Sequence, residues 1–332
     1  MMKKGSYAMQ LSRAVICSHA FLFWPAFFLV GVSASAQQRN PTPESAPRKA
    51  STTFRFDRNG STTIPFEFVE NSIYVPVRIN GEPLWFLLDS GSSFMLIDRG
   101  KAQVLGLSLT KGRSIHGAGT GKVQIDSVQD KLVLQLQGLE MSGYQFSAVG
   151  LQSVSDNIGH KEEGLLGYDF FKTFVVTVNY DSKTLTITDP RFFRNPPKGT
   201  VVPLGFQGKW PVIHATIAVP GLAPVDSEFV VDSGSGDAVD HPLIKQSTGE
   251  IKRTRSQATS LGDPVTGYFG HIDWLQIGPY RMHNPATFCC GGAEKAIGGE
   301  ILRRFTVTFD YGHAKMIFEP NSQFDDPFLT KD

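Results

Sequence analysis

The sequence contains few of the residues that bind metals or cross-link chains. Its 332 residues include 3 cysteines and 8 histidines, and neither type has the spacing of a zinc site. Cys289 and Cys290 are neighbours, which can bridge each other only through a strained ring. We therefore expect no metal, and we interpret this pair as structural thiols or as a bond to another molecule rather than as a vicinal disulfide.

The sequence also lacks an excess of charge of either sign. The formal net charge is +1, and charged residues make up 19% of the chain. Nucleic-acid-binding proteins usually carry a strongly basic face, so we expect no nucleic-acid partner. With 41% apolar residues, the composition is that of a soluble globular protein, and the length allows one large domain or two medium ones.

The N-terminal apolar run is short for a membrane span. It covers residues 20–32, whereas a helix that crosses a bilayer needs about 20 apolar residues. Three basic residues precede it and Ala34-Ser35-Ala36 offers a cleavage site, so residues 1–36 are predicted to be a secretory signal peptide. The mature protein would be periplasmic or secreted without a membrane partner, and an uncleaved segment would instead anchor it in the membrane.

The composition predicts an all-β protein with an N-terminal leader. Glycine (33) and phenylalanine (25) are frequent, as in β-proteins with many tight turns. The polar segment that follows the signal peptide is rich in Pro, Ser, Thr and Arg, which is typical of disorder. A basic, proline-rich connection at 189–203 separates two lobes. The predicted divisions are the signal peptide at 1–36, a disordered leader at 37–61, an N-terminal lobe at 62–195, a C-terminal lobe at 196–320 and a tail at 321–332.

Each lobe contains a predicted hairpin that leads into an acidic motif. The first hairpin joins 73–79 to 84–88 through Asn80-Gly81, a pair typical of tight turns. The second joins 212–219 to 228–231. Short helices are predicted at 99–105, 168–172 and 300–304.

The most informative feature is an Asp-Ser-Gly-Ser motif that occurs twice, each time after an apolar run. The copies are Asp89–Ser92 and Asp232–Ser235, 143 residues apart. Downstream, Leu165-Leu166-Gly167 parallels Ala296-Ile297-Gly298 at an offset of 131. This period is too long for a solenoid. We interpret the repeat as a duplicated lobe, in which two carboxylates meet across an internal pseudo-twofold axis.

Two neighbouring carboxyl groups have a defined use in catalysis. Held close together, they cannot both ionise readily, and they share a proton. The ionised group can take a proton from water while the protonated group polarises a carbonyl. We therefore predict that Asp89 and Asp232 are catalytic.

The rest of each motif is predicted to support the aspartates. Gly91 and Gly234 allow the backbone to approach closely. Ser92 and Ser235 are expected to donate hydrogen bonds to the carboxylates, and Ser90 and Ser233 to bond across the lobes. A single Asp-Ser-Gly could simply close a hairpin, but two copies with paired glycine motifs argue against that. Hydrolysis by a motif serine would need a histidine base, and no histidine is suitably placed.

A glycine-rich segment is predicted to form a flap. It lies at 114–122, with Gly117, Ala118 and Gly119 at its centre between two extended runs. Its distance from Asp89 in the sequence would let it fold over a cleft. The second half has a similar segment at 261–268.

The repeated motifs resemble those of the pepsin/retropepsin-like aspartic proteases, over about residues 62–320. The resemblance implies an all-β, bilobal fold with two pseudo-twofold-related lobes and a central cleft. It also implies that Leu166, Gly167, Ile297 and Gly298 pack behind the aspartates. The chain departs from the pepsin type in having serine after both aspartates, no tyrosine in the flap segment and none of the disulfides usual in vertebrate members.

The sequence thus predicts an exported, bacterial-type aspartic endopeptidase without a cofactor. Its substrate would be an extended peptide or protein held by strand-like backbone hydrogen bonds. A monomer is expected, because both half-sites lie in one chain. The alternative is a catalytically inactive periplasmic protein that binds peptides or glycans on the same fold. The cleavage specificity, the pH optimum and any inhibitory role of the leader stay open at this point.

Overall fold

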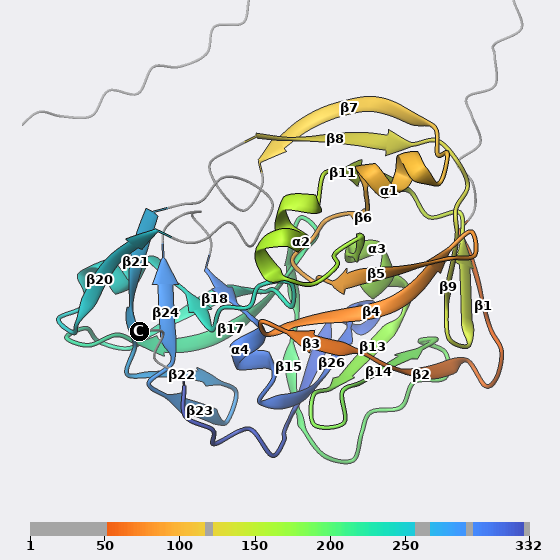
Figure 1. The fold of residues 1–332 in the computed structure, drawn as a ribbon. Helices are drawn as coiled ribbons and strands as arrows, with labels where there is room; N and C mark the ends of the chain where they lie inside the picture. Colours follow the sequence, from red (N-terminus) through yellow and green to blue (C-terminus); the bar gives the residue numbers. More distant parts are fainter. Residues whose placement is uncertain (1–51, 117–121, 256–265, 290–294, 329–332) are drawn as a thin grey trace, which may run out of the picture. The chain divides into compact units, whose positions relative to one another are not determined.

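The structure is a computed structural model that describes residues 52–116, 122–255, 266–289 and 295–328. Lys49–Asp332 form one compact unit. Most of the regular structure in the described residues is β-strand, arranged in two lobes (Figure 1), which confirms the predicted all-β, bilobal fold. The predicted signal peptide lies outside the described residues. No helix of the described part is long and apolar enough to cross a membrane.

The N-terminal lobe is built on a sheet to which the first half of the chain contributes eleven described strands. The sheet runs β1-β10-β9-β4-β5-β12-β6-β11-β8-β7, with β3 paired to β4. The strands are β1 (Thr53–Phe56), β3 (Glu67–Val69), β4 (Ser72–Ile79), β5 (Glu82–Leu88), β6 (Met95–Asp98), β7 (Leu109–His116), β8 (Lys122–Val128), β9 (Val133–Leu136), β10 (Leu139–Ser142), β11 (Phe146–Val149) and β12 (Gly164–Leu166).

The first strand corrects the predicted extent of the leader. β1 pairs with β10 along its whole length, so the prediction of a disordered segment at 37–61 is wrong from residue 53 onward. The rings of Phe54 and Phe56 lie 5.0 and 5.7 Å from the buried ring of Phe174. These aromatic contacts hold the segment in the fold despite its polar neighbours.

The C-terminal lobe is built on a second sheet, which has ten described strands. It runs β20-β21-β24-β19-β25-β18-β17-β22-β23, with β16 paired to β17. The strands are β16 (Gly205–Gln207), β17 (Trp210–Ala218), β18 (Val225–Val231), β19 (Val239–Asp240), β20 (Ile251–Arg255), β21 (Thr266–His271), β22 (Trp274–Ile277), β23 (Tyr280–His283), β24 (Ala286–Cys289) and β25 (Ala296–Ile297).

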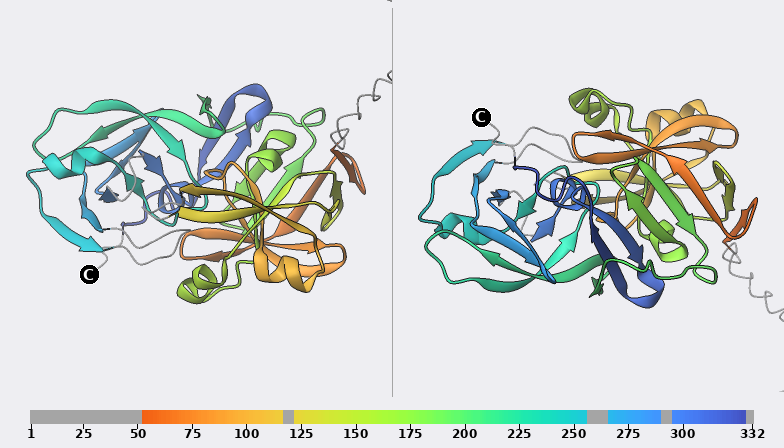
Figure 2. Two further views of the ribbon diagram at one scale, coloured as in Figure 1. Left: turned by 90° about the horizontal axis from the view of Figure 1, so that it is seen from above. Right: turned by 90° about the horizontal axis from the view of Figure 1, so that it is seen from below.

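A third sheet joins the two halves of the chain. Its six described strands run β15-β27-β26-β13-β14-β2, and Figure 2 shows the two halves on opposite sides of the molecule. At its centre β13 pairs with β26, where Thr177 Oγ1 and Thr308 Oγ1 are 2.9 Å apart. The strands are β2 (Ser61–Pro65), β13 (Val175–Asn179), β14 (Thr184–Thr188), β15 (Thr200–Pro203), β26 (Phe305–Asp310) and β27 (Lys315–Pro320).

The predicted hairpins and short helices are present. β4 and β5 are joined by Asn80 and Gly81, whose positive φ angles of 52° and 92° fit a tight hairpin turn. β17 and β18 form the second hairpin. The helices among the described residues are α1 (Arg99–Val104), α2 (Gln152–Ile158), α3 (Tyr168–Thr173), α4 (Gly299–Leu302) and the 3₁₀ segments η1 (Pro242–Gln246) and η2 (Tyr311–His313). The sequence did not predict α2, η1 or η2.

The two lobes repeat one connectivity around their acidic motifs. In the first lobe, β12 pairs in parallel with β5 and antiparallel with β6. In the second, β25 pairs in parallel with β18 and antiparallel with β19. The strand of each apolar-apolar-Gly motif therefore lies beside the strand that leads into Asp89 or Asp232. This repeated arrangement supports the interpretation of a duplicated lobe.

Buried side chains form a main core and a smaller second cluster. Phe86 and Leu88 of β5 belong to the main core, whereas Leu87 belongs to the smaller cluster. Because successive residues of a strand point to opposite faces, the smaller cluster covers the other face of the first sheet. Tyr74 stands directly across from Leu87 on β4 and belongs to the same cluster.

Candidate active site

The two Asp-Ser-Gly loops start where β5 and β18 end. The amide of Asp89 donates to the carbonyl of Leu166 (3.0 Å), and the amide of Asp232 donates to the carbonyl of Ile297 (2.9 Å). Each aspartate is thus tied at its backbone to the last apolar residue of the neighbouring apolar-apolar-Gly motif. This hydrogen bond extends the parallel strand pairing by one residue in both lobes.

The glycine of each apolar-apolar-Gly motif lies against the backbone of the acidic loop. A Cβ atom on Gly167 would lie 2.0 Å from the carbonyl oxygen of Phe94, and one on Gly298 would lie 2.3 Å from that of Asp237. Real Cβ atoms do not approach backbone so closely, so a side chain at either position would displace the loop. The structure places Gly167 and Gly298 directly behind the two acidic loops.

The carboxyl group of each aspartate lies against the glycine of the other loop. A Cβ atom on Gly91 would lie 2.5 Å from Cγ of Asp232, and one on Gly234 would lie 2.5 Å from Cγ of Asp89. The glycines therefore leave the space in which the two carboxyl groups meet. This reciprocal contact brings together two residues that are 143 positions apart in the sequence.

The two loops are locked to each other by their first serines. Ser90 Oγ donates to the carbonyl of Val231 (2.7 Å) and accepts from the amide of Ser233 (3.0 Å). Ser233 Oγ donates to the carbonyl of Leu88 (2.8 Å) and accepts from the amide of Ser90 (3.0 Å). Both serines are buried. The predicted cross-lobe bonds are therefore present as four buried hydrogen bonds.

The second serine of each loop does not act as predicted. Ser92 Oγ accepts from the amide of Phe94 (3.2 Å), and Ser235 Oγ accepts from the amide of Asp237 (3.3 Å). These hydroxyls close their own turns, which is a common use of serine. Asp232 instead accepts from the backbone amides of Gly234 (3.0 Å) and Ser235 (3.2 Å) at Oδ1.

Burial raises the pKa of both aspartates. For Asp89 the largest cause is desolvation, followed by the charge of Asp232, and its pKa rises well above the ordinary value. Desolvation also raises the pKa of Asp232, but the two backbone amides and a hydrogen bond from Asp89 oppose the rise. The two backbone amides therefore favour Asp232 as the ionised member of a pair that shares one proton.

Tyr311, at the start of η2, lies near enough to the pair for the charges of both aspartates to act on its hydroxyl. Its ring stacks on Phe171 at 5.4 Å, and its side chain is buried. Burial and then the charge of Asp89 raise the pKa of its hydroxyl well above the ordinary value. The phenol therefore stays protonated beside the pair and adds no charge to it.

A buried carboxyl group that acts on Asp89, that of Glu162, was missed by sequence reasoning. Glu162 Oε2 accepts from the buried hydroxyl of Tyr74 (3.2 Å). Burial raises its pKa to about 7, although the bond from Tyr74 acts in the opposite direction. The available signal was the acidic pair Glu162-Glu163, which directly precedes the first apolar-apolar-Gly motif.

Each lobe also places a hairpin turn on the acidic loop of the other lobe. At the β3–β4 turn, Asn71 Nδ2 donates to the carbonyl of Gly236 (3.0 Å). At the β16–β17 turn, Lys209 Nζ donates to the carbonyl of Ser93 (3.1 Å). The two acceptors are equivalent positions in the repeated loops. The reciprocal contacts reinforce the serine bonds in fixing one loop against the other.

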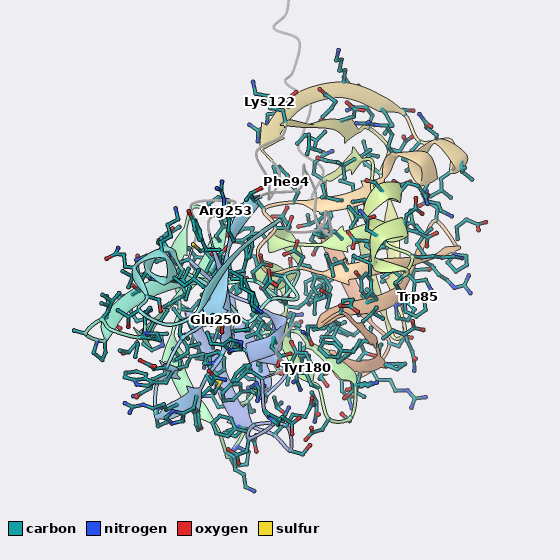
Figure 3. The ribbon with its side chains drawn as sticks, turned by 60° about the vertical axis from the view of Figure 1, so that its left-hand side comes forward. Trp85, Phe94, Lys122, Tyr180, Glu250 and Arg253 are labelled. Atoms are coloured by element: carbon teal, nitrogen blue, oxygen red, sulfur yellow. The ribbon has the colours of Figure 1, made fainter. Side chains whose placement is uncertain are left out.

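The predicted flap falls at the end of the β7–β8 hairpin. Gly117, Ala118 and Gly119 lie outside the described residues, as does most of the segment 261–268. Figure 3 shows Phe94, which follows the first acidic loop, on the side of the N-terminal lobe toward β20 and Arg253, whereas Trp85 lies on the opposite side of that lobe. The role of the flap segment at 114–122 in covering a cleft stays a prediction.

The described residues also bear on cysteine and metal chemistry. Cys289 is disulfide-bonded, so the interpretation of this residue as a free structural thiol is wrong. Within the described ranges, no group of three or more His, Cys, Asp or Glu side chains is arranged to hold a metal ion.

Comparison with known proteins supports a protease of the aspartyl class. Residues 75–170 match the model of a family described as aspartyl protease. This stretch contains Asp89 and the first apolar-apolar-Gly motif. A comparison with curated proteins gives no match.

Proposed function

We propose that the protein is an aspartic endopeptidase that hydrolyses peptide bonds with a water molecule activated between Asp89 and Asp232. The observation that carries this proposal is the reciprocal contact of the two half-buried carboxyl groups with Gly234 and Gly91. It gives one chain both halves of an acid–base pair, at the ends of equivalent strands. The family match over residues 75–170 supports the same class of reaction.

The difference between the two carboxyl groups assigns a role to each. Ionised Asp232 takes a proton from water as the water oxygen attacks the carbonyl carbon of the scissile peptide bond. Protonated Asp89 donates a hydrogen bond to the carbonyl oxygen and so stabilises the charge that develops there. A proton then passes to the peptide nitrogen as the C–N bond breaks, which releases an acid and an amine.

The substrate would be an extended segment of peptide or protein. Extended peptides bind enzymes of β-structure by adding backbone hydrogen bonds along strands, and β7 stands at the end of the described strand order of the first sheet. The proposal also includes export through the segment 1–36 and action as a monomer. The division into lobes at 62–195 and 196–320 belongs to the same proposal.

A cluster of Ser227, His241 and Lys295 in the C-terminal lobe does not support a serine hydrolase mechanism. Ser227, His241 and Lys295 lie together beside a surface hollow of about 410 Å³ in the C-terminal lobe. His241 Nδ1 accepts from the amide of Leu243, so its proton is on Nε2, 3.3 Å from Ser227 Oγ. A base must accept the serine proton at that nitrogen, and this histidine donates there instead.

The experiment that tests the proposal is a peptide-library cleavage assay. Purified residues 37–332 and the Asp89→Asn/Asp232→Asn double variant are incubated with the library from acid to mildly alkaline pH. We expect cleavage by the wild type alone, which would also report the specificity. A folded wild type that cleaves nothing at any pH would overturn the proposal and favour the peptide- or glycan-binding alternative.

A further inference from the structure

Glu162 is held firmly at the start of the first apolar-apolar-Gly motif. It lies between α2 and β12, and its side chain is buried. Its amide donates to Ser155 Oγ (2.9 Å), which in turn donates to the carbonyl of Glu162 (3.2 Å). These two bonds tie the residue to α2 and fix the direction in which its carboxyl group enters the lobe.

The carboxyl group of Glu162 lies on the same side of the first sheet as Asp89. Its partner Tyr74 stands across from Leu87 on β4, and Leu87 precedes Asp89 by two positions. Side chains two positions apart on a strand share a face. After burial and the effects of Asp232, the charge of Glu162 is a further cause that raises the pKa of Asp89.

Within the described residues, no cation is within ion-pair distance of Glu162, in contrast to its neighbour. Glu163 pairs with Lys101 Nζ at 2.7 Å and also accepts from the amide of Trp85. The positive charge nearest in the sequence is therefore already balanced by Glu163. A negative charge on Glu162 would act on its surroundings without a counter-ion.

The other titratable groups around Glu162 are engaged elsewhere. His160 stacks on the ring of Tyr74 with centroids 4.3 Å apart, and its Nε2 lies 2.8 Å from Glu67 on β3. Asp156 of α2 accepts from Gln152 at the surface. Tyr74, whose hydroxyl bonds Glu162, is buried with it.

We infer that Glu162 is a positioning residue that keeps the shared proton on the Asp89–Asp232 pair at neutral and mildly alkaline pH. This inference rests on the proposed function. Below neutral pH Glu162 is protonated and has no charge. Its pKa of about 7 means that it becomes anionic as the pH rises through neutrality. The new charge opposes loss of the last proton from the pair, so the singly protonated, active form persists to higher pH.

The inference is tested by the pH profile of kcat/KM for the Glu162→Gln variant on a cleaved peptide. We expect the alkaline limb to move to lower pH by about half a unit, with the acid plateau within a few-fold of wild type. Glu163→Gln is the matched control. It removes an adjacent buried carboxylate that is already paired, and it should leave the limb in place. An unchanged limb in folded Glu162→Gln, or equal shifts in both variants, would overturn the inference.

A second readout does not depend on activity and separates this inference from the proposed function. The carboxyl carbons of labelled Asp89 and Asp232 are followed by NMR during a pH titration of wild type and Glu162→Gln. Loss of the last proton from the pair should occur at lower pH in the variant, even if no peptide is cleaved. Identical midpoints would contradict the role of Glu162, whereas cleavage by the Asp89→Asn/Asp232→Asn variant would contradict the dyad itself.

Discussion

At the level of single residues, Asp89 and Asp232 differ although their loops are equivalent. Asp232 accepts two backbone amides at Oδ1, whereas Asp89 accepts the amide of Gly91 and its Oδ1 is buried without a hydrogen-bond partner among the described residues. An unsatisfied buried oxygen is costly, and a protonated carboxyl bears this cost better than a carboxylate. The asymmetry therefore belongs to the environment of the two side chains.

The buried pair should lower stability at neutral pH, which gives a first prediction. A carboxyl whose pKa is raised on folding contributes stability below its unfolded pKa, and this contribution is lost as the pH rises through the folded pKa. The pKa of Asp89 is raised well above 3.8. The free energy of unfolding of Asp89→Asn should therefore be about 1–2 kcal/mol higher than that of wild type at pH 7. This difference should shrink toward pH 4.

Thermal and urea unfolding of the two proteins across this pH range measure the effect. Asp237→Asn serves as the control, because this aspartate is exposed and its substitution should change stability little. A variant at position 89 that is less stable than wild type at pH 7 would contradict the raised pKa.

Gly91 gives a second prediction at the same scale. Its missing side chain is what lets Asp232 approach, since a Cβ would lie 2.5 Å from Cγ. Gly91→Ala should lower activity about 100-fold and stability by about 1–3 kcal/mol, because the carboxyl group must shift. Gly150→Ala is a suitable control, as no atom lies within 4 Å of its added Cβ. Equal activities for the two variants, measured on one peptide, would refute the close contact.

At the level of elements, the two acidic loops are bonded to each other through buried serine hydroxyls. Ser90 and Ser233 each bond the backbone of the opposite loop through buried groups. Removing either hydroxyl leaves a carbonyl and an amide without partners, at about 1–3 kcal/mol for each buried group. We predict that Ser90→Ala and Ser233→Ala each lower the free energy of unfolding by about 2–4 kcal/mol.

The double variant distinguishes a shared network from two independent bonds. Because the hydroxyls serve the same pair of loops, the effect of Ser90→Ala/Ser233→Ala should be smaller than the sum of the single effects. Ser92→Ala, whose hydroxyl bonds within its own turn, should cost less than either. Additive losses in denaturant unfolding would show that the two serines act separately.

The elements that the sequence predicted are those with local causes. The Asn80-Gly81 turn, the two acidic motifs and the glycines that follow them carry their conformations in adjacent residues. The helix α2 had no such signal, because Leu151 caps it without a side-chain bond. The predicted bonds from Ser92 and Ser235 to the carboxylates are not formed, because both hydroxyls bond within their own turns and these short-range bonds compete with longer-range ones.

Long-range partners explain the remaining misses. The carboxyl of Glu162 meets Tyr74 across 88 positions. Arg304 is fully buried and donates to the carbonyl of Phe324, 20 positions away, although its sequence context suggests only a charged helix end. Such contacts depend on how sheets and loops meet, and a single sequence carries no local signal for them.

At the level of the whole molecule, the third sheet makes the two halves mutually dependent. β2, β13 and β14 come from the first half and β15, β26 and β27 from the second, with β13 bonded to β26. Separation would leave each half with an open sheet edge and exposed apolar side chains. We predict that residues 52–195 and 196–328, expressed apart, do not form stable monomers.

Size-exclusion chromatography and circular dichroism of the separate halves test this, with the joined chain 52–328 as the control. Aggregation or loss of cooperative unfolding in both halves is the expected result. Two soluble, cooperatively unfolding monomers would show that each lobe is an independent domain.

The account depends most on Asp89 and Asp232 acting as one catalytic pair. The most direct test is the rate of cleavage of one identified peptide by Asp89→Asn, Asp232→Asn and the control Asp325→Asn, an exposed aspartate far along the chain from both motifs, each verified as folded. The account predicts a loss of at least about 10²–10⁴-fold for either member of the pair and near-wild-type activity for the control. Retention of wild-type activity by either variant of the pair would contradict it.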